Sequence, residues 1–165
     1  QSGAVAYGAK ITQMSGIIVE RDGGRALVNP SVTIDGTASY APLAMAQKSL
    51  MSPCMTQNLG SNFDTSGMLV RIFGRVPRAA DDHPEYLGGL GAYVFYVDDG
   101  SGAIDGREAE ATGIRCIIPY SAGWNPSMND YIMVEGIAAY ETSELDGTKV
   151  RTILFPEFTL LASGI

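Results

Sequence analysis

Basic residues and histidine are scarce in this sequence. It has 11 Lys and Arg against 18 Asp and Glu, a formal net charge of −7, and one histidine, His83. Binding to a nucleic-acid backbone relies on a surplus of Lys and Arg, so the charge argues against that class of partner. A Ser-His-Asp triad would have to use His83, which lies in the acidic stretch DDHPE (residues 81–85) without a nucleophile elbow nearby. We therefore expect a protein that is not an enzyme and needs no cofactor.

Long apolar runs and metal-binding motifs are also missing. No run approaches the roughly 18 apolar residues of a membrane-spanning helix. Two cysteines and one histidine are too few for a convincing zinc site. The spacing of Asp98, Asp99 and Asp105 does not fit an EF-hand loop, and DDGSG is more simply a turn. We expect neither a membrane span nor a metal.

The two cysteines, Cys54 and Cys116, are an even count, which in an exported protein indicates one disulfide. The alternative is two unrelated buried thiols. The chain begins with Gln1 rather than Met, which fits a secretory precursor whose signal peptide has been removed. We therefore predict an extracellular or cell-surface protein.

Strand signals recur along the chain. Alternating apolar, β-branched and aromatic residues lie between turns rich in Gly, Asp and Asn, and helical periodicity is limited to the short stretch 44–50. The composition, 45% hydrophobic and 18% charged, is that of a globular protein. We predict an all-β protein. In its C-terminal part the predicted strands are residues 67–78, 92–97, 113–120, 131–141 and 150–162.

These five strands, the first with Gly74 inside it, resemble the strand plan of the OB-fold, a five-stranded Greek-key barrel. The stretches YVFYVDDGSG, GIRCIIP and YIMVEGIAA resemble OB-fold domains of the anticodon-binding and replication-protein type. The resemblance implies a fold and not an activity, since such domains bind nucleic acids, oligosaccharides or proteins and also occur in tandem in exported bacterial proteins. We expect an OB-like barrel at 67–165, a packed connector at 37–66 and a β-hairpin arm at 1–36.

The arm is similar to the last two predicted strands. Residues 15–17 (Ser-Gly-Ile) match 135–137 (Glu-Gly-Ile), and residues 27–34 match 153–160 with Pro and Thr at the same places. Unless the match is chance, the arm corresponds to strands four and five of a barrel that lacks its first three strands. An isolated hairpin is marginal in water, so its apolar face and open edges need a cover. Three alternatives for this cover remain open: the chain's own barrel, a lost part of a two-barrel protein, and a neighbouring subunit.

We favour the neighbouring subunit, and so predict a structural subunit of an extracellular assembly, most simply a head-to-tail fibre of this chain. The arm residues predicted for the interface are Ile11, Ile17, Val19, Leu27, Val32 and Ile34. The alternative function is an exported OB module that binds saccharide or, less favoured at this charge, single-stranded nucleic acid. The ligand-face candidates for that alternative are Arg71, Arg75, Tyr93, Phe95 and Trp124, although most of these rings would be needed in the core.

Overall fold

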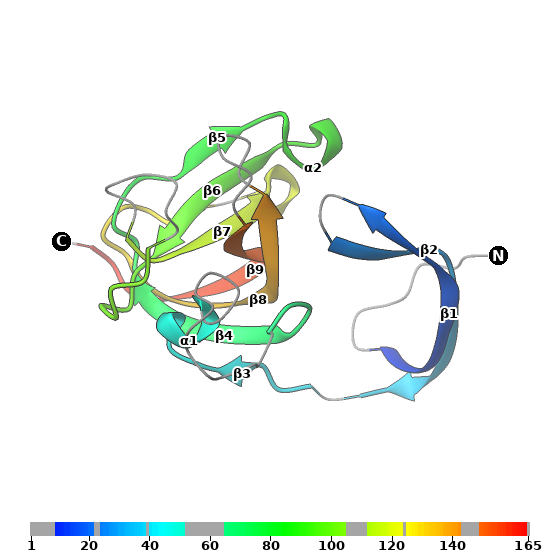
Figure 1. Cartoon of the computed structure of the whole chain (residues 1–165). Helices are drawn as coiled ribbons and strands as arrows, with labels where there is room; N and C mark the ends of the chain where they lie inside the picture. The colour runs from blue at the N-terminus through cyan, green and yellow to red at the C-terminus, as the bar shows by residue number, and fades with distance from the viewer. Residues whose placement is uncertain are drawn as a thin grey trace, which may run out of the picture. The chain divides into compact units, whose positions relative to one another are not determined.

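A computed structural model describes residues 9–21, 24–38, 40–51, 65–104, 112–123, 125–142 and 149–164. The chain divides into two compact units, an N-terminal unit of Gln1–Ala41 and a main unit of Pro42–Ile165 (Figure 1). Strands dominate the described part of both units, so the prediction of an all-β protein is confirmed.

The N-terminal unit is one antiparallel β-hairpin, which we name the arm hairpin. Its strand β1 (Ala9–Arg21) pairs with β2 (Gly24–Thr37) along the whole length of both. The β-branched residues and the alternation in both segments favour extended backbone. The two residues between these strands, Asp22 and Gly23, lie outside the described residues. Within the described part of the chain, no third strand pairs with either edge of this hairpin.

The main unit is built around one seven-stranded mixed sheet (Figure 1). Its strands are β3 (Leu43–Ala44), β4 (Leu69–Arg75), β5 (Asp81–His83), β6 (Ala92–Val97), β7 (Ile114–Pro119), β8 (Tyr131–Thr142) and β9 (Lys149–Ala162). Their order is β3-β4-β8-β9-β7-β6-β5, and β3/β4 and β7/β9 are its parallel pairs. All five strands predicted for this region are present, as β4, β6, β7, β8 and β9.

The sheet of the main unit is not closed into a complete barrel. β4 and β6 meet through an isolated bridge between Arg75 and Asp98, rather than through a continuous ladder. The five-stranded OB-like barrel therefore stays a prediction. In the described residues, the strands are connected by α1 (Gln47–Met51), a 3-10 turn at Tyr120–Ala122 and α2 (Tyr86–Gly89), in which Leu87 and Gly88 have left-handed backbone angles.

β3 and α1 attach the start of the connector to this sheet. β3 runs parallel to β4, and Leu50 of α1 is fully buried in the core. The backbone N–H of Gln47 donates to Oδ2 of Asp99 at 2.9 Å, and the Asp99 N–H donates to Oε1 of Gln47 at 3.3 Å. This apolar part of the connector therefore packs on the main unit, and residues 52–64 lie outside the described residues.

The sheet buries apolar side chains on both faces. Period-two alternation in β6 sends Phe95 to one face and Val94 and Tyr96 to the other. The main core on the first face includes Val70, Ile72, Phe95, Ile114, Ile118, Ile132, Val134, Ala138 and Ile153. A smaller cluster on the second face is covered by Tyr86 and Leu87 of α2. In the described segments, no helix has both the length and the apolar character to cross a membrane.

Candidate assembly surface

The arm hairpin exposes large apolar side chains. Met14 is 59% exposed, and Ile17 and Ile18 are 63% and 69% exposed. Ile11, Val28 and Ile34 are exposed as well. A single exposed apolar side chain is ordinary, but several on the two faces of a two-stranded sheet are typical of surfaces that another chain covers.

The arm hairpin shares one of its irregularities with the hairpin formed by β8 and β9, which we name the closing hairpin. In the arm hairpin the pairing shifts across Gly16, which lies opposite residues 29–30 (Asn-Pro). In the closing hairpin the pairing shifts across Gly136, which lies opposite residues 155–156 (Phe-Pro). One residue against two is a β-bulge, a local kink that increases strand twist. The bulges fall at the positions that the sequence match aligns, so the two hairpins correspond in structure as well as in sequence.

Both bulges need a glycine for the same steric reason. A Cβ atom added to Gly16 would lie 2.8 Å from Cγ of Leu27 and 2.9 Å from the carbonyl oxygen of Val28. A Cβ atom added to Gly136 would collide with Cγ2 of Ile153, which is the counterpart of Leu27. In each hairpin, the glycine leaves room for an aliphatic side chain of the opposite strand.

The corresponding side chains of the two hairpins differ in burial. Val134 and Ala138 of β8 are fully buried in the main core. Their counterparts on β1 are Met14 and Ile18, which are 59% and 69% exposed. The face that the closing hairpin turns toward the core is therefore bare in the arm hairpin, and we name it the bare face.

The six residues predicted for the interface divide evenly between exposed and half-buried side chains. The exposed three are Ile11, Ile17 and Ile34, and the half-buried three are Val19, Leu27 and Val32. The prediction omits Met14 and Ile18, although they are the counterparts of core residues. Extending the match outward from Gly16 and Gly136, residue by residue, is the sequence signal that identifies them.

The aromatic ligand-face candidates do not form an exposed platform among the described residues. Phe95 is 0% exposed and lies in the main core, so the expectation that its ring offers a ligand face is wrong. Tyr93 packs against the same core, and its ring centroid lies 4.7 Å from that of Tyr120. Period-two spacing places both rings on the core side of β6. Trp124 lies outside the described residues.

The two arginines of β4 are engaged by other side chains of the main unit. Arg71 forms an ion pair across β4 and β8, with its Nη2 2.5 Å and its Nε 2.6 Å from Oε1 of Glu135. Arg75 donates a hydrogen bond to Oδ1 of Asn129. An incoming ligand would have to compete with these charge-assisted contacts.

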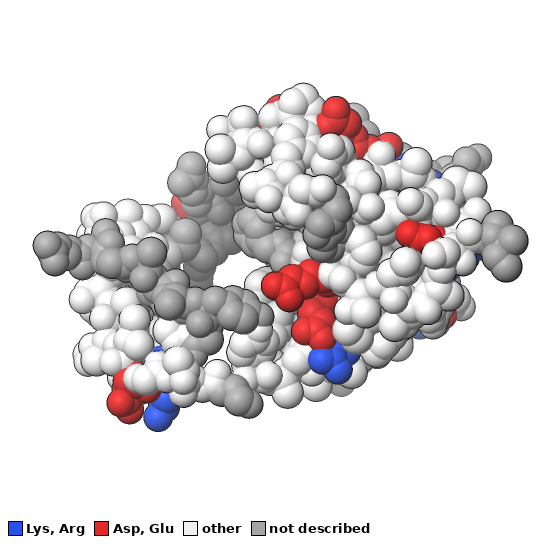
Figure 2. All heavy atoms as spheres, turned by 180° about the vertical axis from the view of Figure 1, so that it is seen from behind, with Lys and Arg blue, Asp and Glu red and all other residues white. Residues whose placement is uncertain are grey.

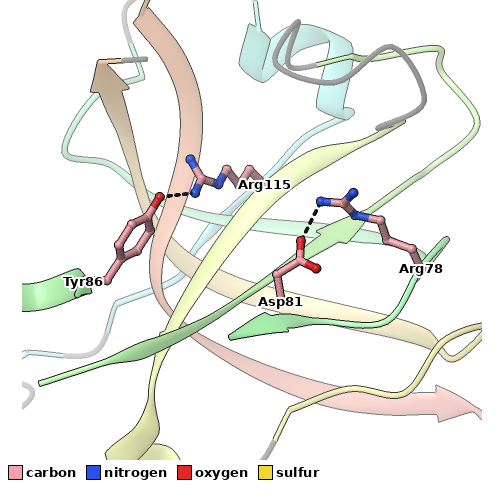
Figure 3. A network of polar contacts seen from close by, with 4 residues as sticks. All are labelled: Arg78, Asp81, Tyr86 and Arg115. Atoms are coloured by element: carbon pink, nitrogen blue, oxygen red, sulfur yellow. Dashed lines mark hydrogen bonds and ion pairs between the residues drawn. The ribbon is translucent and has the colours of Figure 1, made fainter. Parts of the chain in front are cut away.

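Polar contacts fasten the short segments to the second face of the sheet, as Figure 3 shows. Arg115 of β7 donates to the hydroxyl of Tyr86 at 2.6 Å, and its guanidinium lies 5.5 Å from the centre of that ring. Arg78 donates to Oδ2 of Asp81 at 2.7 Å and lies 4.6 Å from the centre of the Tyr96 ring. Guanidinium groups combine such stacking with planar hydrogen bonding, and here both serve to hold α2 and β5 in place.

His83 lies in β5 and packs beside these contacts. Its ring stacks on Tyr86 with 4.5 Å between centroids, and its Nδ1 lies 2.9 Å from Oε1 of Glu85. The hydrogen bond with His83 lowers the pKa of Glu85. The imidazole therefore contacts a ring and a carboxylate. These contacts agree with a structural role of His83 as well as with a catalytic one.

Asp98 and Asp99 form the turn that their sequence predicts. Oδ1 of Asp98 accepts the Gly100 N–H at 2.8 Å, and Oδ1 of Asp99 accepts the Ser101 N–H at 2.9 Å. Burial raises the pKa of Asp99, but its hydrogen bonds outweigh burial and the pKa is lowered. Asp105 lies outside the described residues. Across the described ranges, no three His, Cys, Asp or Glu side chains are grouped so that they could hold a metal ion.

Cys116 is a free and fully buried thiol on β7. Desolvation by burial raises its pKa, which keeps the thiol protonated and unreactive. Cys54 lies outside the described residues, so the pairing of these two cysteines stays a prediction.

Charge is divided unevenly between the two units. The N-terminal unit holds three Lys and Arg and three Asp and Glu, whereas the main unit holds eight and fifteen. The N-terminal unit is therefore neutral, and the main unit carries the whole net charge of −7. Figure 2 shows a face on which Lys and Arg form only small separate spots, so no broad basic patch is visible there.

Comparison with protein-family models, with curated proteins and with solved structures found no match. The function must therefore be argued from the surfaces of the molecule, of which the bare face is the most distinctive.

Proposed function

We propose that this protein is a non-enzymatic structural subunit of an extracellular assembly, most simply a head-to-tail fibre of identical chains. Strands of a neighbour complete the arm hairpin of each subunit. One observation carries the proposal: Met14 and Ile18 are exposed at positions where the closing hairpin buries Val134 and Ala138. Apolar side chains that are exposed at positions where the matching hairpin buries them indicate a surface that a partner covers.

The proposal includes an OB-like fold for the main unit. The order β4-β8-β9-β7-β6, the parallel contact of β7 with β9 and the bridge from β4 to β6 fit a five-stranded Greek-key barrel. In that arrangement the closing hairpin supplies the last two strands, and so does the arm hairpin in a second, incomplete copy. The fold itself implies no activity, so the function rests on the arm hairpin.

Covering the arm hairpin is energetically reasonable. Burial of a large apolar side chain contributes about 1.5–3 kcal/mol, and Met14 and Ile18 of the bare face are each more than half exposed. Their combined burial is comparable to the low end of the roughly 4–15 kcal/mol that association costs in lost freedom. Backbone hydrogen bonds along the open strand edges add to the gain, because these N–H and C=O groups are already aligned for pairing.

Light scattering and negative-stain images of the full chain test this proposal. Wild-type protein should form polymers, and Ile18→Asp should convert them to monomers because the substitution places a charge on the bare face. Leu90→Asp is the matched control, since Leu90 is 79% exposed on the main unit, and it should leave polymers intact. Polymers that form equally well with Ile18→Asp would contradict the proposal, as would a wild-type protein that stays monomeric at every concentration.

A further inference from the structure

The correspondence of the two hairpins also specifies how strands would pair with the arm hairpin. In the main unit, residues 133–137 of β8 pair antiparallel with β4, and residues 152–154 of β9 pair parallel with β7. The register match places the counterparts of these edges at residues 13–17 of β1 and residues 26–28 of β2. Both of these arm edges lack a partner strand within the described residues.

We infer that the arm hairpin binds a three-stranded β-segment of a neighbouring polypeptide, whose strands take the roles of β4, β6 and β7. One strand pairs antiparallel along residues 13–17, another pairs parallel along residues 26–28, and the middle strand spans the bare face. The inference rests on the proposed function and adds to it the chemistry and direction of the occupant.

A single added strand would not be enough to cover the bare face. In the main unit, Val134 and Ala138 share one core cluster with Ile72 of β4, Phe95 of β6 and Ile114 of β7. All three strands therefore contribute to the cover of the closing hairpin. An edge strand alone would satisfy backbone groups but leave much of the apolar face in water.

The side chains of the arm hairpin set the size of the residues that face it. Met14 and Ile18 are larger than their counterparts Val134 and Ala138, whereas Val32, which pairs with Met14, is smaller than its counterpart Phe158. The bare face therefore differs from its counterpart in shape more than in bulk. Interiors are close-packed, and extra methylene groups must be matched by smaller neighbours. The occupant should therefore carry smaller inward residues opposite Ile18 and larger ones opposite Val32.

A folded second copy holds a segment of this type, but that segment is already in use. Its β4 pairs with β8 and its β7 pairs with β9. A second copy therefore provides the segment only when it releases its own closing hairpin. Residues 65–123 of this chain, prepared as a separate polypeptide, are accordingly a fair probe of the occupant, because the smaller Val32 offsets the bulk of Met14 and Ile18.

A cross-linking experiment on the full chain tests the inference. The register pairs Met133 with Phe73, so its arm counterpart Gln13 should face the Phe73 position of the bound probe. With native cysteines removed by Cys54→Ser and Cys116→Ala, a Gln13→Cys chain and a Phe73→Cys probe should form a disulfide under mild oxidation. The matched control is an Ile72→Cys probe, whose thiol points to the other face and should cross-link at least tenfold less.

The outcomes separate the inference from the proposed function. Selective cross-linking supports the inference both when the chain alone forms a polymer that the probe dissolves and when the chain alone is a monomer that the probe binds. In the second case the inference stands, but the proposed fibre of identical chains is ruled out. Equal cross-linking by both probes overturns the inference. A third outcome is a chain whose polymers are lost on Ile18→Asp substitution but neither cross-link with the probe nor dissolve when it is added. In that case the inference is wrong and the proposed function stands. A monomer that binds no probe contradicts both.

Discussion

The arm hairpin and the closing hairpin share a bulge but differ in what surrounds them. Gly16 and Gly136 occupy the same place in the strand pairing, and each leaves room for an aliphatic side chain opposite. In the closing hairpin that side chain, Ile153, is fully buried, and in the arm hairpin its counterpart Leu27 is half-buried. Local sequence thus defines the hairpin, whereas burial depends on the strands beside it, which is why strand propensity depends strongly on context.

The largest expected difference between the hairpins concerns this aliphatic side chain. Ile153→Ala should lower the free energy of unfolding of the main unit by about 2–5 kcal/mol, because it leaves a cavity in the core. Leu27→Ala should change the same transition by less than about 0.5 kcal/mol, because Leu27 belongs to the other unit. Urea unfolding followed by fluorescence of Trp124, the one tryptophan, measures both. Equal losses would mean that the two hairpins are buried alike.

A second, smaller difference is expected at the bulges. Gly136→Ala should destabilise the main unit by about 1–3 kcal/mol, because the added methyl group collides with Ile153. Gly16→Ala should leave the unfolding of the main unit unchanged while weakening assembly, since the collision with Leu27 distorts the arm hairpin alone. Thermal unfolding and light scattering on the same samples separate these effects. A loss of main-unit stability in Gly16→Ala would break the comparison.

The smallest expected effect is a pH dependence that is confined to the main unit. The pKa of Asp99 is lowered by hydrogen bonds that include the backbone of Gln47, so its contribution is present at neutral pH. It should be lost as the pH falls below about 4 and through the pKa of the folded state. Asp99→Asn should cost under about 1 kcal/mol at neutral pH, since the group is exposed, and should flatten this part of the pH profile. An unchanged profile in unfolding experiments from pH 3 to 7 would argue against this role.

The sequence predicts much of the fold because its alternation is strong. Five strands of the main unit and both strands of the arm hairpin lie where period-two patterns place them. β3 and β5 escape prediction because they have only two and three residues, and β5 reads Asp-Asp-His, which carries no strand pattern. Such short strands form because a longer neighbouring strand has a free edge with which they can pair. The position of that edge depends on the fold and cannot be predicted from the short segment itself.

The candidate site is less predictable than the fold. A period-two pattern shows that Tyr93 and Phe95 share a face, but only the packed structure shows that this face is the core. Met14 and Ile18 escape prediction for the converse reason, because their importance appears only when β1 is matched to the buried strand β8. Patterns within one strand identify its faces, and partners decide which face is covered.

Hydrogen–deuterium exchange of the full chain at increasing protein concentration tests the central claim most directly. The reporters are the amides of residues 13–17 in β1, with residues 133–137 of β8 as the internal reference. If neighbours complete the arm hairpin, exchange in β1 should slow as concentration rises, because its outer edge gains hydrogen-bond partners, while exchange in β8 stays constant. Exchange in β1 that is fast and independent of concentration would contradict the claim that another chain covers the arm hairpin.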